Sequence, residues 1–262
     1  MRNSNSGYKV AVFILSLIIL AQWAMLAKIK PGPAPKIIPS SIKGKIAIVL
    51  DDWGYNPNNL ASLTQIKYPL TLSVLPNLSY SKKVAAQIYK NGFEVILHLP
   101  MEPEPREKVR LEKNTILTTM DENSIRKIIA DDLNNVSYAK GVSNHMGSRV
   151  TENSKTMAII FKELKKRQLY FLDSFVSGDS VCLDLAHRMR IPFAKRDIFL
   201  DNNENPEYIR GQIGKLKTRA GIYGEALGIG HDRKLTLEVL KEMMPKLVKE
   251  GYKLVFVSEL TR

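Results

Sequence analysis

Acidic and imidazole side chains follow several predicted buried strands of this sequence, at the point where each strand ends. The clearest case is the run 46–54, in which an apolar stretch ends in two adjacent carboxylates before a glycine. The complete strand-end set comprises Asp51, Asp52, His98, His145, Asp173, Asp197, Asp201 and His231. Because the carboxyl ends of parallel strands meet at one edge of an α/β sheet, these side chains should lie close together. Two imidazoles and a carboxylate would leave open positions on Zn²⁺ or a similar divalent ion.

Each of these signals also has a structural interpretation. The Asp51–Asp52 pair could cap the turn and the helix that follows, because aspartate is common at such caps. A single histidine after a strand is more often a structural hydrogen-bonding group than a metal ligand. Three of the four histidines share this location with several acids, which favours one metal-dependent site. The fourth, His187, lies on a basic helical stretch and is interpreted as solvated, and the single Cys182 as a small buried apolar residue.

Predicted strands and helices alternate from Lys45 onward. Apolar runs of strand length occur at 46–52, 70–74, 94–99, 141–148, 169–174, 191–194, 223–230 and 253–258. These eight runs, about seven of which would be parallel strands separated by helices, predict an α/β fold, either an irregular (β/α) barrel or an open parallel sheet. The polar, proline-interrupted stretch 100–119 is long for a loop inside a compact domain, so it is expected to face the substrate.

The net charge of the chain limits the classes of molecule that it is expected to bind. The 262 residues contain 39 Lys and Arg against 26 Asp and Glu, a formal net charge of +13, and residues 1–45 contain cations but no acid. A positive balance favours polyanions such as membrane surfaces and anionic glycans. Nucleic acid is not expected, since no zinc-finger, helix-turn-helix or RNA-reading aromatic motif accompanies the charge.

The N-terminal region differs in composition from the rest. Residues 8–27 are almost entirely apolar, with Arg2 before the run and Lys9 at its start, so residues 1–29 are predicted to be an uncleaved signal anchor or transmembrane segment. Residues 30–43 are proline-rich and predict an extended linker. Residues 44–262 would then form the catalytic domain outside the cytoplasm, in the periplasm or at the cell surface.

Several motifs resemble the divergent polysaccharide deacetylase family, a relative of the NodB-type carbohydrate esterases. The matching runs occur in order across residues 44–262: Ile46–Tyr55, His98–Glu102, Gly141–Ser148, Phe171–Ser174, Arg196–Asp201 and Ile229–His231. The resemblance implies an irregular (β/α) barrel and one divalent metal ion, usually zinc. It also implies hydrolysis of N-acetyl or O-acetyl groups on a carbohydrate polymer.

The resemblance also implies roles for individual residues. Asp51 would be the general base, Asp52 a metal ligand, and His231 the group that protonates the leaving amine or alkoxide. Asp197 would orient that histidine or form part of the substrate wall. Arg149 or Arg196 would hold the base in its ionised form.

The sequence departs from the NodB pattern in the second motif. That motif usually has two histidines four residues apart, whereas His98 is followed at that spacing by Glu102. His145, from a different strand, would supply the second imidazole. The expected ligands are therefore Asp52, His98 and His145, with Glu102 as a substitute ligand or as a partner of one.

Three functions remain open from the sequence. The first is a metal-dependent glycan deacetylase of the cell envelope. The second is a catalytically inactive protein on the same fold that binds glycan or scaffolds envelope protein partners. The third is a metal phosphohydrolase, which an acid pair after the first strand would also suit. The absence of a P-loop type of glycine-rich phosphate cradle in the sequence disfavours the third.

Overall fold

The computed structural model describes residues 13–15 and 42–262. The chain divides into two units between Ser40 and Ser41, and the second unit, Ser41–Arg262, is compact. The predicted signal anchor over residues 1–29 and linker over 30–43 fall almost wholly outside the described residues. Within the part that is described, no helix combines the length and the apolar character that crossing a bilayer requires.

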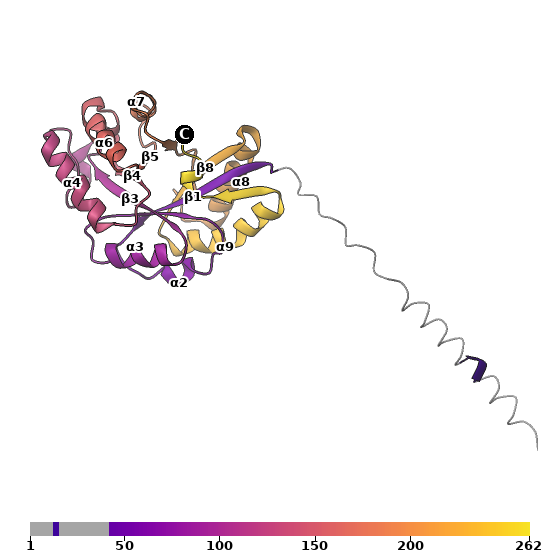
Figure 1. Ribbon diagram of the computed structural model, residues 1–262. Coiled ribbons are helices and arrows are strands. Elements are labelled where there is room, and N and C mark those ends of the chain that lie inside the picture. Colours follow the sequence, from indigo (N-terminus) through magenta and orange to yellow (C-terminus); the bar gives the residue numbers. More distant parts are fainter. Residues whose placement is uncertain (1–12, 16–41) are drawn as a thin grey trace, which may run out of the picture. The chain divides into compact units, whose positions relative to one another are not determined.

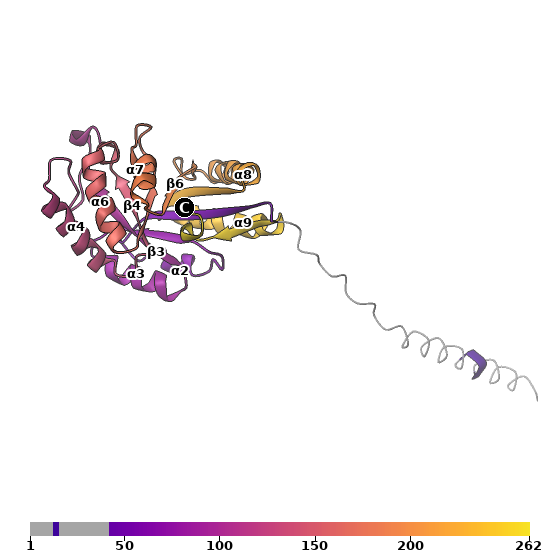
Figure 2. The same ribbon diagram turned by 45° about the horizontal axis from the view of Figure 1, so that its top comes forward.

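One curved parallel sheet forms the centre of residues 42–262. Its nine strands are β1 (Gly44–Trp53), β2 (Thr71–Val74), β3 (Glu94–Met101), β4 (Gly141–Met146), β5 (Tyr170–Asp173), β6 (Phe193–Lys195), β7 (Ile198–Phe199), β8 (Glu225–His231) and β9 (Tyr252–Val255). The order is β6-β5-β4-β3-β2-β1-β8-β7, with β9 also paired to β1. No ladder joins β6 to β7 among these strands, so the sheet curls into an open half-barrel (Figures 1 and 2). The predicted irregular α/β barrel is confirmed, with nine strands instead of about seven.

Helices cover the outer face of the curl (Figure 2). They are α2 (Leu60–Leu63), α3 (Ser81–Lys90), α4 (Glu122–Asn135), α5 (Ser148–Thr151), α6 (Ser154–Lys166), α7 (Cys182–Met189), α8 (Pro206–Tyr223) and α9 (Lys234–Lys249). Three of them begin at a side-chain cap. Asp121, Asn153 and Asn205 accept backbone N–H groups in the first turns of α4, α6 and α8, which satisfies donors that have no partner inside the helix.

Strand alternation separates the two faces of the sheet. In β1, Ile46, Ile48 and Leu50 belong to the large apolar cluster shared with the helices, whereas Ala47 and Val49 belong to a smaller cluster inside the curl. Successive side chains of a strand point to opposite faces, so Asp51 continues the inner series. The inner face therefore changes from apolar to acidic at the carboxyl end of β1.

A buried carboxylate holds two loops against α4. Asp132 is fully buried, and its Oδ1 accepts a hydrogen bond of 2.6 Å from Asn77 Nδ2 in the β2–α3 loop. Asn114, in the β3–α4 loop, is a second side chain that acts to lower the pKa of Asp132. Both asparagines have left-handed backbones, with φ of 60° and 64°. Burial raises the pKa of Asp132 to about 7, with a smaller rise from Asp131, despite the two asparagines, which act to lower it.

This shift predicts a stability profile. Folded Asp132 keeps its proton up to a pH of about 7, whereas in the unfolded chain it ionises near 3.8. Because the folded state binds more protons between these values, the contribution of Asp132 to stability is complete below the lower pH and is lost as pH rises to the upper one. The loss should reach about 4 kcal/mol. The asparagine in Asp132→Asn cannot ionise. In urea unfolding measured from pH 4 to 8, the free energy of unfolding of this variant should therefore fall less with rising pH than that of the wild-type protein. The same dependence of the free energy of unfolding on pH in both proteins would contradict a raised pKa of Asp132.

Candidate metal-binding active site

The Asp51–Asp52 pair departs from regular strand geometry. The pairing of β1 with β2 shifts register between Leu50 and Trp53, and Asp52 has a left-handed backbone with φ of 67°. This break in alternation turns both carboxylates toward one point. Asp51 Oδ2 lies 3.7 Å and Asp52 Oδ1 3.3 Å from His98 Nε2. A left-handed backbone is uncommon for a residue with a side chain, and such strain is often found at functional sites.

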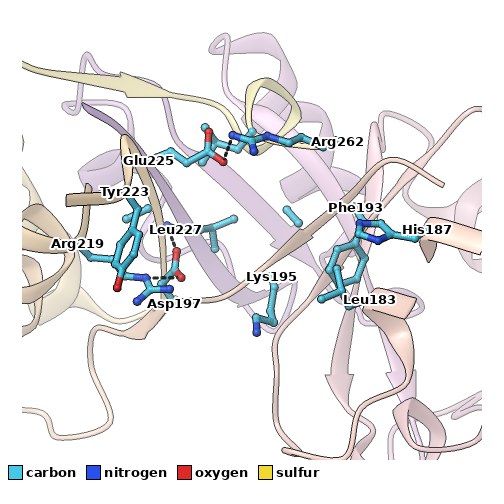
Figure 3. A pocket seen from close by; sticks show the side chains of 13 residues that line it. Leu183, His187, Phe193, Lys195, Asp197, Arg219, Tyr223, Glu225, Leu227 and Arg262 are labelled. Carbon is cyan, nitrogen blue, oxygen red and sulfur yellow. Dashed lines mark hydrogen bonds and ion pairs between the residues drawn. The ribbon is translucent and has the colours of Figure 1, made fainter. Parts of the chain in front are cut away.

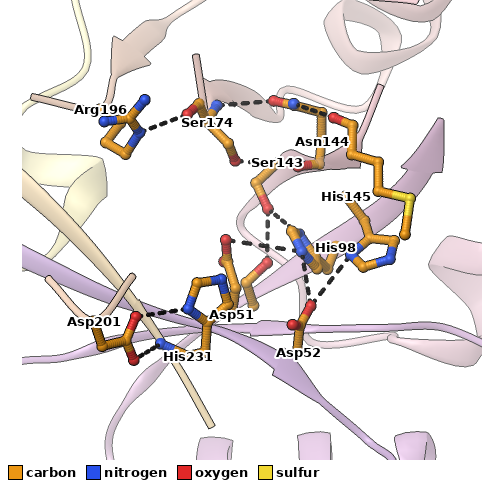
Figure 4. Close-up of polar contacts among 12 residues, drawn as sticks. Asp51, Asp52, His98, Ser143, Asn144, His145, Ser174, Arg196, Asp201 and His231 are labelled. Carbon is orange, nitrogen blue, oxygen red and sulfur yellow. Dashed lines mark hydrogen bonds and ion pairs between the residues drawn. The ribbon is translucent and has the colours of Figure 1, made fainter. Parts of the chain in front are cut away.

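Asp52, His98 and His145 form a three-donor cluster at the carboxyl ends of β1, β3 and β4 (Figure 4). Asp52 Oδ1 lies 3.3 Å from His98 Nε2 and 3.2 Å from His145 Nδ1, and all three donor atoms lie within 4.8 Å of one another. Metal–ligand bonds of about 2.0–2.1 Å at a tetrahedral angle separate the donors by about 3.4 Å. Asp52 Oδ1 is buried and accepts no hydrogen bond. The three donors therefore fit a divalent ion.

Two buried hydroxyls orient His98. Its Nδ1 lies 2.8 Å from Ser143 Oγ, which lies 2.6 Å from Ser73 Oγ, and Ser73 acts to lower the pKa of Asp51. If Nε2 faces an ion, Nδ1 carries the hydrogen and donates it to Ser143. No motif in the sequence marks the two serines. The available signal was a hydroxyl at an inner-face position of an otherwise apolar strand.

The pKa values of the two adjacent carboxylates are shifted in opposite directions. Burial raises the pKa of Asp51, outweighing the lowering effect of His98, and the Asp52 charge adds to the rise. Burial also acts to raise the pKa of Asp52, but its contacts with His145 and His98 hold that pKa well below the usual range. Asp51 Oδ1 is buried and accepts no hydrogen bond. The pair thus offers a fixed anion at Asp52 and a proton acceptor at Asp51.

His231, at the end of β8, is held by Asp201. Its Nδ1 lies 2.7 Å from Asp201 Oδ1, while Asp201 Oδ2 accepts the His231 backbone N–H at 2.8 Å and the Thr236 hydroxyl at 2.6 Å. Burial acts to lower the pKa of His231, but the hydrogen bond and the charge of Asp201 raise it overall, helped by Asp51 and Asp52. Since Nδ1 is occupied, Nε2 is the ring nitrogen left to donate a proton.

Asp197, expected to orient His231, lies elsewhere. Its Oδ1 accepts a 2.6 Å hydrogen bond from Arg219 Nε, and its Oδ2 accepts the backbone N–H of Leu227 at 2.8 Å. It lines a pocket of about 390 Å³ between β6 and β8 (Figure 3). This open side of the half-barrel, between β6 and the β7–β8 pair, is called the seam. The carboxylate that contacts His231 is Asp201. Asp197 instead binds the backbone of β8 at Leu227.

Glu102 anchors the β3–α4 loop. Its Oε2 accepts hydrogen bonds from the Thr118 backbone N–H at 2.8 Å and hydroxyl at 2.9 Å. Glu102 is not in the three-donor cluster of the described residues. Arg149 Nη1 lies 3.0 Å from Glu104 Oε2, in the same loop. The Tyr55 hydroxyl, three residues after Asp52, donates to Glu112, so this loop lies beside the site as expected.

Arg149 and Arg196, expected to keep the base ionised, have other partners. Arg149 pairs with the loop acids, and Arg196 Nε and Nη2 donate to the carbonyls of Ser174 and Phe175. Within residues 42–262, neither guanidinium forms an ion pair with Asp51. The groups that act to lower the pKa of Asp51 are His98, His231 and Ser73.

One protein is similar to this chain in sequence, and a solved structure is similar to it in fold. An uncharacterized Escherichia coli K12 protein, YibQ, is 36% identical over 206 residues, which cover 79% of this chain and 64% of that protein. The chain thus spans less than two thirds of that relative's length. The crystal structure of the uncharacterized protein ATU2773 from Agrobacterium tumefaciens C58 matches with a TM-score of 0.80 at 20% identity, covering 87% of this chain and 92% of that one.

A more distant solved structure shares the fold. BA3943 from Bacillus anthracis, described as a CE4 family pseudoenzyme, matches with a TM-score of 0.51 at 16% identity, covering 90% of this chain and 70% of that one. The sequence model of the divergent polysaccharide deacetylases matches residues 48–261, which include every strand-end residue considered above. The chain belongs to the divergent polysaccharide deacetylase family.

Proposed function

We propose that the protein is a metal-dependent hydrolase that removes acetyl groups from an N- or O-acetylated glycan of the cell envelope. The observation that carries this proposal is the position of Asp51. It is a buried carboxylate, 3% exposed, with one oxygen free of hydrogen bonds, and it lies beside the donor cluster of Asp52, His98 and His145. A carboxylate placed in this way can take a proton from an attacking water molecule.

Each residue of the site then has a defined task. Asp52, His98 and His145 would hold the ion, and their two nitrogens and one oxygen suit zinc. When bound, the ion would lower the pKa of a water molecule and polarise the acetyl carbonyl. Asp51 accepts the proton of that water. His231 donates a proton from Nε2 to the departing amine or alkoxide, while Asp201 fixes Nδ1.

The cellular setting is part of the same proposal. Residues 1–29 would anchor the protein in the cytoplasmic membrane and residues 30–43 would space the domain from it, which leaves residues 44–262 outside the cytoplasm. The apolar and proline-rich composition of these segments supports this arrangement. An envelope protein partner would fit the same location.

An inactive glycan-binding or scaffolding protein is the second candidate. Two observations favour it: a pseudoenzyme is found on the same fold, and no arginine pairs with Asp51 within residues 42–262. The retained donor cluster and the His231–Asp201 pair favour the hydrolase. A metal phosphohydrolase is disfavoured, since the sequence lacks a glycine-rich phosphate cradle.

Replacement of Asp51 tests the proposed base. Asp51→Asn should leave metal binding intact and lower the rate of acetate release from acetylated cell-wall oligosaccharides by about 10²–10⁴-fold, because the proton acceptor is lost. Asp197→Asn is the matched control, since Asp197 lies at the β6–β8 seam, and it should retain activity. If the metal-loaded wild-type protein releases no acetate from any cell-wall or biofilm glycan, the hydrolase proposal fails and the inactive candidate replaces it.

Metal binding can be tested without a substrate. Isothermal titration of the metal-free protein with Zn²⁺ should give one site per chain, and Asp52→Ala, His98→Ala and His145→Ala should each abolish or strongly weaken it, because each removes one donor. Glu102→Ala should leave the affinity unchanged, because Glu102 bonds within its own loop. Loss of zinc binding in Glu102→Ala with retention in His145→Ala would contradict this ligand set.

The acid role of His231 predicts the alkaline limb of the pH profile. The protonated imidazole is the active form, so kcat/KM should fall as pH rises through its pKa, which the structure raises above the reference value of 6.5. Asp201→Asn removes the charge that causes the rise, so this limb should move to lower pH. A limb that stays in place in Asp201→Asn would exclude His231 as its origin.

A further inference from the structure

Arg196 lies at the open seam of the half-barrel, in the segment between β6 and β7. Its Nε and Nη2 donate hydrogen bonds of 2.7 Å each to the carbonyl oxygens of Ser174 and Phe175, the two residues that follow β5. Phe175 has a left-handed backbone with φ of 49°. The guanidinium is thus fixed to one side of the seam by two directional contacts.

The same guanidinium packs on an aromatic ring from the other side of the seam. Arg196 Cζ lies 3.7 Å from the ring centroid of Phe199, which belongs to β7. β7 pairs with β8, and Phe199 is opposite Ile229, two residues before His231. Because no ladder joins β6 to β7 in the described sheet, the Arg196 contacts connect the β5–β6 edge to the strand pair that carries His231.

Phe199 is in turn stacked against the imidazole of His231. The two rings have centroids 6.1 Å apart and an interplanar angle of 16°. Asp201 fixes the imidazole only at Nδ1. A hydrogen bond at one edge leaves the ring able to tilt about that contact, whereas a parallel neighbouring ring restricts its plane. The edge contact and the face contact together define where Nε2 points.

We infer that Arg196 is a positioning residue for His231, acting through the ring of Phe199. The guanidinium holds Phe199 against the imidazole, and the imidazole then keeps the orientation in which Nε2 is directed at the leaving group. The inference rests on the proposed function for the role of Nε2. It differs from the expectation that Arg196 keeps the base ionised, because its contacts lead to the acid side of the site and not to Asp51.

Kinetics of four variants test this inference. Arg196→Gln and Phe199→Leu should each lower kcat roughly tenfold with KM nearly unchanged, because small misplacements of a reacting group affect the chemical step more than binding. Arg196→Lys keeps the charge but loses the planar fork, so it should not restore kcat. The double variant Arg196→Gln/Phe199→Leu should be no slower than Phe199→Leu alone, since both changes interrupt one chain of contacts.

The matched control is Lys195→Gln. Lys195 is the neighbouring cation, and its Nζ lies 4.2 Å from the ring centroid of Phe175 instead of Phe199. Its removal should leave kcat unchanged, which separates the stack from a general effect of positive charge near the seam. Unchanged kcat in both Arg196→Gln and Phe199→Leu would overturn the inference. An increase in KM at constant kcat in Arg196→Gln would also overturn it and identify Arg196 as a substrate-binding cation.

A second readout needs neither substrate nor metal. The His231 Cε1–H proton resonance, assigned with His231→Gln, should shift and broaden in Arg196→Gln and Phe199→Leu but not in Lys195→Gln, while thermal melts show all variants folded. If the resonance responds in this way and no glycan is deacetylated, the positioning stands and the proposed function fails. If deacetylation is found and the resonance does not respond to Arg196→Gln, the positioning fails and the function stands.

Discussion

The left-handed backbone of Asp52 is the constraint on which the site depends. In a regular strand Asp51 would face the inside of the curl and Asp52 the helices. The shift in register after Leu50 and the positive φ of Asp52 bring both carboxylates to the same side, within 3.7 Å of one imidazole nitrogen. The strain of this conformation is offset by the buried core of β1 on either face, and its result is a fixed anion beside a proton acceptor.

The open half-barrel arranges the remaining groups around this pair. His98 and His145 project from the inner faces of β3 and β4, on one side of β1, and His231 projects from β8 on the other. The two histidines of the three-donor cluster thus lie on one side of Asp51 and the His231 imidazole lies on the other. The incomplete closure between β6 and β7 leaves the His231 flank without a continuous ladder, and the Arg196–Phe199 contact bridges that gap.

Much of the architecture and most of the candidate site could be predicted from the apolar runs and the polar residues at their ends. The apolar runs located the parallel strands, and the rule that their carboxyl ends share an edge gathered Asp51, Asp52, His98, His145 and His231. Asp173 did not join them. It lies on the same face of β5 as Phe171, which packs in the outer cluster, and it caps the turn after the strand through Phe175 N and Ser180 Oγ. Alternation within that strand could have excluded it.

Other features depended on contacts that sequence does not encode locally. His231 contacts Asp201 and not Asp197 because of the register between β7 and β8. Phe199 is paired with Ile229, and the same register, extended by two residues, places residue 201 opposite residue 231. The β7 ladder that sets this register has only two residues, too few to read from a pattern. The left-handed backbone at Asp52 likewise coincides with the shift in β1–β2 register, which involves a strand distant in sequence.

The Asp51–Asp52 distortion would create a cation site that two histidines from neighbouring strands complete. Anomalous diffraction at the zinc edge, from crystals of the zinc-soaked protein, tests it most directly. We expect one strong peak per chain, about 2.1 Å from an Asp52 carboxylate oxygen, His98 Nε2 and His145 Nδ1. A density map without that peak, or with zinc bound away from Asp52 while the two imidazoles face apart, would contradict it.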